Sequence, residues 1–177
     1  MTAVTLEQLK YPIGKFVAPA TYSAEFISEC ISEIEKFPSL LKKEVSNLSD
    51  EQLDTPYRPE GWTIRQVVHH CADSHMNGLT RFKLTLTEDL PTIKPYRENL
   101  FAELADTLTM GIPPSLIAIE GIHARWAVLL KSLNDTHFHR KYIHPEYKKE
   151  FSLHEATALY SWHCKHHLAH ITSLKKT

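Results

Sequence analysis

The feature that most constrains the fold of this chain is helical periodicity: in four long stretches, apolar residues recur every three or four positions. No stretch of useful length alternates between apolar and polar residues as a half-buried β-strand does. Only five of the 177 residues are glycine, which suits long helices better than a turn-rich β fold. We therefore expect an all-α fold, a four-helix bundle formed by one domain that spans residues 1–177. The periodic stretches cover residues 23–45, 63–87, 114–133 and 152–174.

Residues that favour helix ends mark where these helices begin. The capping-box pattern, a Ser or Thr followed three residues later by Gln or Glu, starts at Ser49, Thr63 and Ser152. It predicts a short helical turn after Ser49 and the starts of the second and fourth long helices. Pro114 is a favoured first residue for the third helix. Pro38 lies inside the first helix and should kink or split it.

The remaining segments are expected to be connections. Residues 1–21 contain Tyr-Pro-Ile-Gly and a further proline, which break any helical pattern and predict an extended N-terminal arm. Residues 88–114 are rich in proline and should form a long connection with one short helix near residues 99–107. Residues 134–151 are polar, contain a proline, and are expected to form a loop.

The composition argues against several classes of protein. The formal net charge is −1, whereas a nucleic-acid-binding domain is normally basic. Three cysteines without a C-x-x-C pattern argue against a disulfide framework and favour a reducing compartment. No secretory pattern and no run of about 18 apolar residues is found, so we expect a cytoplasmic protein that does not bind a membrane.

Histidine is abundant, with twelve residues, and several of them lie close together in the last helix. At about 100° per residue, His163 and His167 lie one turn apart at the centre of the apolar stripe of that helix. A buried neutral imidazole needs partners for its ring nitrogens, and one metal ion can serve two of them, as in H-x-x-x-H helices. His166 and His170 form a competing pair nearer the edge of the stripe. The alternative is that all of these are core or surface histidines.

A third ligand would come from the second helix. Helical spacing places His75 on the main apolar stripe and His70 well off it, so spacing alone nominates His75. The alternative for His75 is a packed core histidine, which is also the default interpretation for His123 in the third helix. Three protein ligands would leave one position open at the metal, which is typical of catalytic rather than structural sites.

Several segments resemble a known family. The longest are Tyr57–Asn77, which contains HHCADSH, and Trp162–Ile171, which reads WHCKHHLAHI. Tyr11–Phe16, Arg81–Leu84 and Pro91–Tyr96 add shorter matches. Over nearly the whole chain, the sequence resembles the YfiT branch of the DinB-like superfamily. The resemblance implies a DinB-like four-helix bundle that holds one divalent metal ion, Zn²⁺ or Ni²⁺, with three histidines.

The resemblance also implies which histidines these are. The first ligand is the histidine of an H-x-A-D segment, which is His70 in this chain. The other two are the paired histidines of the last helix, His163 and His167. The resemblance therefore overrules the spacing argument for His75 and agrees with the spacing argument for the pair.

Other residues near these ligands are open to two interpretations each. Asn77 and Arg81 share the flank of His70 and either line a substrate pocket or form a solvated face. Asp73 either accepts a hydrogen bond from the imidazole of His70 or is simply solvated. Cys71 and Cys164 are expected to be small buried residues. No residue beyond the metal ligands is assigned a catalytic role, and no organic cofactor is expected.

The resemblance implies a metal-dependent enzyme that acts on a small molecule. As a hydrolase, it would use a water molecule whose pKa the metal lowers to about 7. The alternative is a bacillithiol-type thiol S-transferase, in which the metal activates a low-molecular-weight thiol as the nucleophile. An interpretation from another class is a non-catalytic bundle that binds a metal or a stress ligand, its site closed by a fourth histidine such as His166 or His170. A homodimer without a nucleic-acid partner is also expected.

Overall fold

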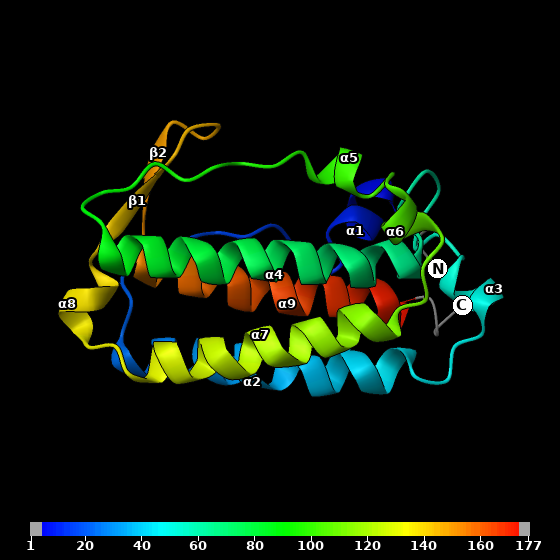
Figure 1. Ribbon diagram of the computed structural model, residues 1–177, viewed down its shortest axis with the longest axis horizontal. Helices are drawn as coiled ribbons and strands as arrows, with labels where there is room; N and C mark the ends of the chain where they lie inside the picture. Colours follow the sequence, from blue (N-terminus) through cyan, green and yellow to red (C-terminus); the bar gives the residue numbers. More distant parts are fainter. Residues whose placement is uncertain (1–4, 174–177) are drawn as a thin grey trace.

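Four long helices lie side by side along the long axis of the molecule in the computed structural model, which describes residues 5–173 (Figure 1). Helix α2 packs against α7 and α9, and α4 packs against the same two helices, so α2 and α4 occupy opposite corners of the bundle. The predicted all-α four-helix bundle is confirmed. The long helices are α2 (Ala24–Val45), α4 (Ile64–Thr87), α7 (Pro113–Lys131) and α9 (Leu153–Ser173).

The connection between α4 and α7 crosses the length of the bundle. It leaves one end of α4, runs along the outside, and reaches the other end, where α7 begins (Figure 1). Helices α4 and α7 therefore run in the same direction. Two short helices, α5 (Glu98–Phe101) and α6 (Ala105–Leu108), lie in this connection where one was expected, and both contact α4.

The predicted helix starts match the structure closely. Capping boxes are formed at Thr63, which begins α4, and at Ser49, which begins the short helix α3 (Asp50–Leu53). At the start of α9, the backbone N–H of Glu155 donates to the Ser152 hydroxyl over 3.1 Å. Helix α7 begins at Pro113, one residue before the expected Pro114, because both prolines fit the first turn. Pro38 does not split α2.

The N-terminal arm differs from the prediction. Residues Leu6–Lys10 form a helix, α1, whose start is fixed by a capping box between Thr5 and Gln8. Local capping thus outweighs the turn-forming residues that follow it. Beyond Tyr11 the arm has no helix or strand until α2 begins. Residues 1–4 of the expected arm, and the expected helix end at Leu174, lie outside the described residues.

The segment expected to be a polar loop contains regular structure. It holds the short helix α8 (Asp135–Phe138) and an antiparallel hairpin of β1 (Lys141–His144) and β2 (Lys149–Ser152). Tyr142 pairs with Phe151, and both side chains are buried. A backbone segment from the α4–α7 connection bonds to β1, since the Ile93 N–H donates to the Ile143 oxygen over 3.0 Å. Each strand has only four residues, so its alternation is too short to detect in the sequence.

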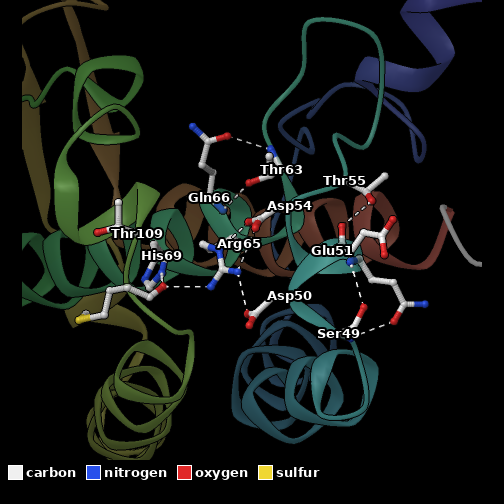
Figure 2. A network of polar contacts seen from close by, with 12 residues as sticks. Ser49, Asp50, Glu51, Asp54, Thr55, Thr63, Arg65, Gln66, His69 and Thr109 are labelled. Carbon is white, nitrogen blue, oxygen red and sulfur yellow. Dashed lines mark hydrogen bonds and ion pairs between the residues drawn. The ribbon is translucent and has the colours of Figure 1, made fainter.

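A network centred on Arg65 fixes the first turns of α4 (Figure 2). The side chain is 7% exposed, and its Nε donates to Asp54 over 2.6 Å. One terminal nitrogen donates to Asp50 over 2.9 Å and the other to the Met110 carbonyl over 3.2 Å. Through these hydrogen bonds, the Arg65 guanidinium holds α3 and the end of the α4–α7 connection against the first turns of α4, which precede His70.

Gly78 permits a close approach at the centre of the bundle. A Cβ added there would lie 2.5 Å from Trp126 Cη2 and 2.6 Å from Tyr160 Cζ, closer than carbon atoms pack. Both aromatic side chains are buried against α4. Within residues 5–173, none of the helices has the length and apolar character needed to cross a membrane.

We predict that Gly78→Ala destabilises the protein, because the added methyl group overpacks the core between two fixed aromatic rings. The expected loss is about 1–3 kcal/mol in the free energy of unfolding, measured by chemical denaturation. Gly111→Ala is the control, since a Cβ there meets only Pro113 Cδ at 3.4 Å. A Gly78→Ala variant as stable as the control would contradict this account of the packing.

Candidate metal centre

Three histidines from two neighbouring helices meet in the bundle. His70 comes from α4, while His163 and His167 come from α9, and one ring nitrogen from each lies within 4.8 Å of the others. The Nε2 atoms of His70 and His163 are 3.3 Å apart. We call this group the three-histidine site. The structure thus brings together the three residues implied by the resemblance, and their role as metal ligands remains a prediction.

Burial keeps these imidazoles neutral. Desolvation lowers the pKa of His70 to about 4, with a smaller effect from His170. Burial also lowers the pKa values of His163 and His167 well below the usual range, and neighbouring histidines add to the shift. A metal binds neutral imidazole through an unprotonated nitrogen, so the site is in the protonation state that ligation requires at neutral pH.

His75 does not join this group. It is 0% exposed and lies behind His163, toward the centre of the bundle, whereas His70 faces the cavity. Spacing nominated His75 because it assumed that α4 buries one narrow stripe. Helix α4 instead packs against α7 and α9, and α5 and α6 also cover it, so residues on two flanks are buried. Both His70 and His75 reach His163 on α9, but only His70 of the two also lies beside His167 and lines the cavity.

A line of hydrogen bonds continues from His163 through the core, and we call it the histidine network. His163 Nδ1 lies 2.9 Å from His75 Nε2, and His75 Nδ1 lies 2.7 Å from His123 Nε2. His123 Nδ1 lies 2.6 Å from the carbonyl oxygen of Ile34. The four residues come from α9, α4, α7 and α2, so the network joins every long helix of the bundle.

The carbonyl at the end of the network determines every tautomer in it. The Ile34 oxygen can only accept, so His123 Nδ1 carries the proton and its Nε2 accepts. His75 must then donate from Nδ1 and accept at Nε2, and His163 must donate from Nδ1. This holds because burial lowers the pKa of His123 to about 4 and that of His75 well below normal, so each ring has one proton. The unprotonated nitrogen of His163 is therefore Nε2, which faces His70.

This arrangement fits a divalent metal ion. Three neutral imidazoles converge, of which His70 and His167 are buried and His163 is half-buried. The hydrogen bond at Nδ1 of His163 directs the lone pair of its Nε2 into the group. Such a bond from the second ring nitrogen is typical of metal-ligating histidines. Within residues 5–173, no fourth His, Cys, Asp or Glu atom joins the three to complete a closed site. An open position is typical of a catalytic metal site.

The competing histidine pair is buried rather than at an exposed edge. His170 donates from Nε2 to the Lys10 carbonyl over 3.1 Å and stacks on Tyr57. His166 stacks on Trp162 with ring centroids 4.4 Å apart. The Nδ1 atoms of both histidines are buried without a partner among the described residues. With His167 they form a second group of possible ligands, separate from His70 and His163.

The three-histidine site opens into a cavity of about 900 Å³. Its walls come from α1, the loop before α4, the α4–α7 connection and the β-hairpin, and they are rich in aromatic side chains. Arg81 lines this cavity, whereas the Asn77 side chain donates to the Asp73 carbonyl over 2.8 Å and does not. Burial and nearby Asp106 raise the pKa of Asp73, whose carboxylate makes no hydrogen bond to His70 within the described part of the chain.

The cysteines near the ligands are buried free thiols. Burial raises the pKa of Cys71 and, well above its normal range, that of Cys164. Neither is activated as a nucleophile.

Sequence reasoning missed the supporting role of His75 and His123. The sequence did offer one signal for this role. His75 and His123 each lie on the apolar stripe of a helix, where a buried imidazole needs hydrogen-bond partners for both ring nitrogens.

Comparisons with known proteins agree with this geometry. A family model described as "DinB superfamily" matches residues 33–171. The chain is 46% identical over 173 residues to "Putative metal-dependent hydrolase YfiT" of Bacillus subtilis (strain 168), covering 98% of this chain and 97% of that protein. It is 48% identical over 172 residues to a "Putative metal-dependent hydrolase" of Geobacillus thermodenitrificans, covering 97% of each.

A solved structure also matches. It is described as "YfiT from Bacillus subtilis is a probable metal-dependent hydrolase with an unusual four-helix bundle topology". The TM-score is 0.93 with 47% sequence identity, over 96% of this chain and 97% of that chain. The resemblance to YfiT-like proteins drawn from the sequence is confirmed.

We predict that the histidine network supports metal binding. Replacing His75 with Phe removes the acceptor for His163 Nδ1–H, frees the ring to adopt the other tautomer, and should weaken zinc affinity about 10–100-fold. His75→Gln should restore part of this affinity, because its side chain can both accept and donate. Zinc affinity is measured by competition with a chromogenic chelator.

The matched control is Phe37→Leu. Phe37 packs on the rings of His75 and His123 without bonding to them, so this variant loosens the same part of the core and keeps the hydrogen bonds. It should lose stability and retain zinc affinity. Unchanged zinc affinity in a folded His75→Phe protein would show that the network does not support the site.

Proposed function

This chain belongs to the DinB superfamily, and we propose that it is a divalent-metal-dependent hydrolase with one ion held by His70, His163 and His167. The observation that carries the proposal is the fixed tautomer of His163. Its Nε2 lone pair is directed toward His70 by a bond on the far side of the ring. A cluster of neutral imidazoles that meets at one point, with no fourth protein ligand among residues 5–173, suits a metal that also contacts a substrate.

Each part of the chain has a definable task in this proposal. A divalent ion held there would supply Lewis acidity, polarising a substrate carbonyl or lowering the pKa of a water or thiol that reaches it. The histidine network orients His163, and Trp62 packs on the ring of His70 with centroids 4.8 Å apart. The aromatic walls of the cavity would limit access of bulk water and hold the apolar part of a substrate.

The size of the cavity favours a second candidate function. About 900 Å³ is near the upper end of the usual range for small-molecule sites, and leaves room for two reactants side by side. A thiol S-transferase that joins a low-molecular-weight thiol, such as bacillithiol, to an electrophile would need this space. The hydrolase remains first because the similar proteins carry that name. A non-catalytic binding bundle is less favoured, since it would be expected to close the site with a fourth ligand.

The remaining expectations form part of the proposal. Three imidazole ligands suit zinc and nickel, and one ion per chain is expected. The expected homodimer would have two exposed apolar residues of α7 available for contact, since Ile117 is 71% and Val128 is 72% exposed and the two lie eleven residues apart on one face of the helix. A cytoplasmic location agrees with three buried free cysteines.

The proposal predicts that His167→Ala abolishes metal binding and activity together. The parent should hold about one metal per chain by elemental mass spectrometry after zinc or nickel is supplied. His139→Ala is the control, because His139 belongs to another group of possible ligands, with Asp135 and His154. The control should keep its metal.

Activity is measured with ester and amide substrates, with and without an added thiol. Turnover without thiol that is lost in His167→Ala supports the hydrolase, and turnover that requires both thiol and an electrophile supports the transferase. A parent protein that remains metal-free, or a His167→Ala variant that retains its metal, would contradict the proposal.

A further inference from the structure

Arg81 is a cavity residue whose guanidinium makes few contacts within the described part of the chain. It lies on α4, eleven residues after His70 and so about 16 Å further along the helix, and it lines the same cavity. Its Nε is buried without a hydrogen-bond partner among residues 5–173. Its only hydrogen bond in that range is a long one, 3.5 Å, from a terminal nitrogen to the Tyr160 hydroxyl. A buried donor left unpaired is costly, so its retention needs an explanation.

Arg58 shares the feature of a buried Nε without a partner among the described residues, but one of its terminal nitrogens donates to the Pro59 carbonyl over 2.9 Å. Two other arginines, buried Arg65 and half-buried Arg140, are held by several short hydrogen bonds. Arg65 bonds to two carboxylates and a carbonyl. Arg140 donates to the carbonyls of Thr85 and Glu88 over 2.7 Å and 2.8 Å. These two side chains hold parts of the fold together. Arg81 has no comparable set of short hydrogen bonds within the described residues, and its side chain lines the cavity instead.

The surroundings of Arg81 add further donors. His144 from β1 is 6% exposed, lines the cavity, and has a buried Nδ1 without a partner in the described part of the chain. Burial, followed by the nearby Arg81 charge, lowers the pKa of His144. The hydroxyls of Tyr142 and Tyr160 also belong to the cavity wall. One fixed positive charge and several hydroxyl or ring donors therefore meet at this end of the cavity.

No carboxylate of the cavity neutralises this charge. The acidic residues that line it, Glu60, Glu98 and Glu146, are exposed, and none forms an ion pair with Arg81 within 4.0 Å. Arginine is the side chain best suited to bind a planar carboxylate, because it offers parallel N–H donors. Tyr160 separates this position from the three-histidine site, since its ring centroid lies 6.0 Å from that of His163 while its hydroxyl approaches Arg81.

We propose that Arg81, with the Tyr160 hydroxyl and His144, forms a subsite for a carboxylate of the substrate, whose reacting group lies at the three-histidine site. This rests on the proposed metal-dependent function and narrows its substrate to an anionic small molecule. The carboxylate and the reacting group would be separated by about the length of a tyrosine side chain. A substrate without the carboxylate leaves Arg81 unpaired and binds more weakly.

The test uses two probes that share a metal-binding group. Adipic acid monohydroxamate carries a hydroxamate at one end and a carboxylate at the other, and its methyl ester has a methyl group in place of the negative charge. Both are titrated into the zinc-loaded protein by calorimetry. The parent should bind the acid at least about tenfold more tightly than the ester, which is typical of hydrogen bonds to a charged group. Arg81→Gln should remove this preference, and Arg81→Lys should keep part of it.

Two controls make the result specific. Arg58→Gln removes a cation that lines the cavity near Tyr57, at the end where His170 lies, and it should retain the preference for the acid. Zinc content is measured for every variant, so a lost preference in zinc-loaded Arg81→Gln reflects the subsite. Equal affinity of the parent for acid and ester, or a preference lost in Arg58→Gln but kept in Arg81→Gln, overturns the subsite alone. A zinc-loaded parent that binds neither probe overturns the metal centre and the subsite with it.

Discussion

Three hydrogen bonds cross the centre of the bundle, from the backbone carbonyl of Ile34 on α2 to the imidazole of His163 on α9. His75 and His123 are buried and His163 is half-buried, so a missing partner would leave an unsatisfied polar atom in the core. The network can form only when all four long helices are in register. It therefore links the packing of the bundle to the three-histidine site: the same contacts that satisfy the core also determine which nitrogen of His163 faces His70.

Helical periodicity predicted the architecture because each long helix has enough residues for the pattern to be clear. The segments that were missed are short. Helix α1 depends on a single capping box, and the strands around Tyr142 and Phe151 are four residues each. The hairpin is stabilised by burial of these two rings and by bonds to the distant Pro91–Ile93 segment. Such contacts depend on the tertiary fold, and no local pattern in the sequence records them.

The site was predictable in part. The spacing of His163 and His167 indicated a shared partner, and the structure places both rings beside each other on α9. His70 came from the family resemblance, since one-stripe periodicity favoured His75. The structure places His75 in another group of histidines than His70, because α4 is covered on more than one flank and both flanks carry buried histidines. The tautomers, and the unpaired donors of Arg81, follow from how distant helices and the hairpin face one another, which requires the folded structure.

The most direct test of the central claim is anomalous diffraction from crystals of the zinc-loaded protein, recorded at the zinc absorption edge. The account predicts one strong peak within bonding distance of Nε2 of His163 and of ring nitrogens of His70 and His167, with His75 still bonded to His163. A peak at His166 and His170 without His70 and His163, or no peak in the presence of excess zinc, would contradict it.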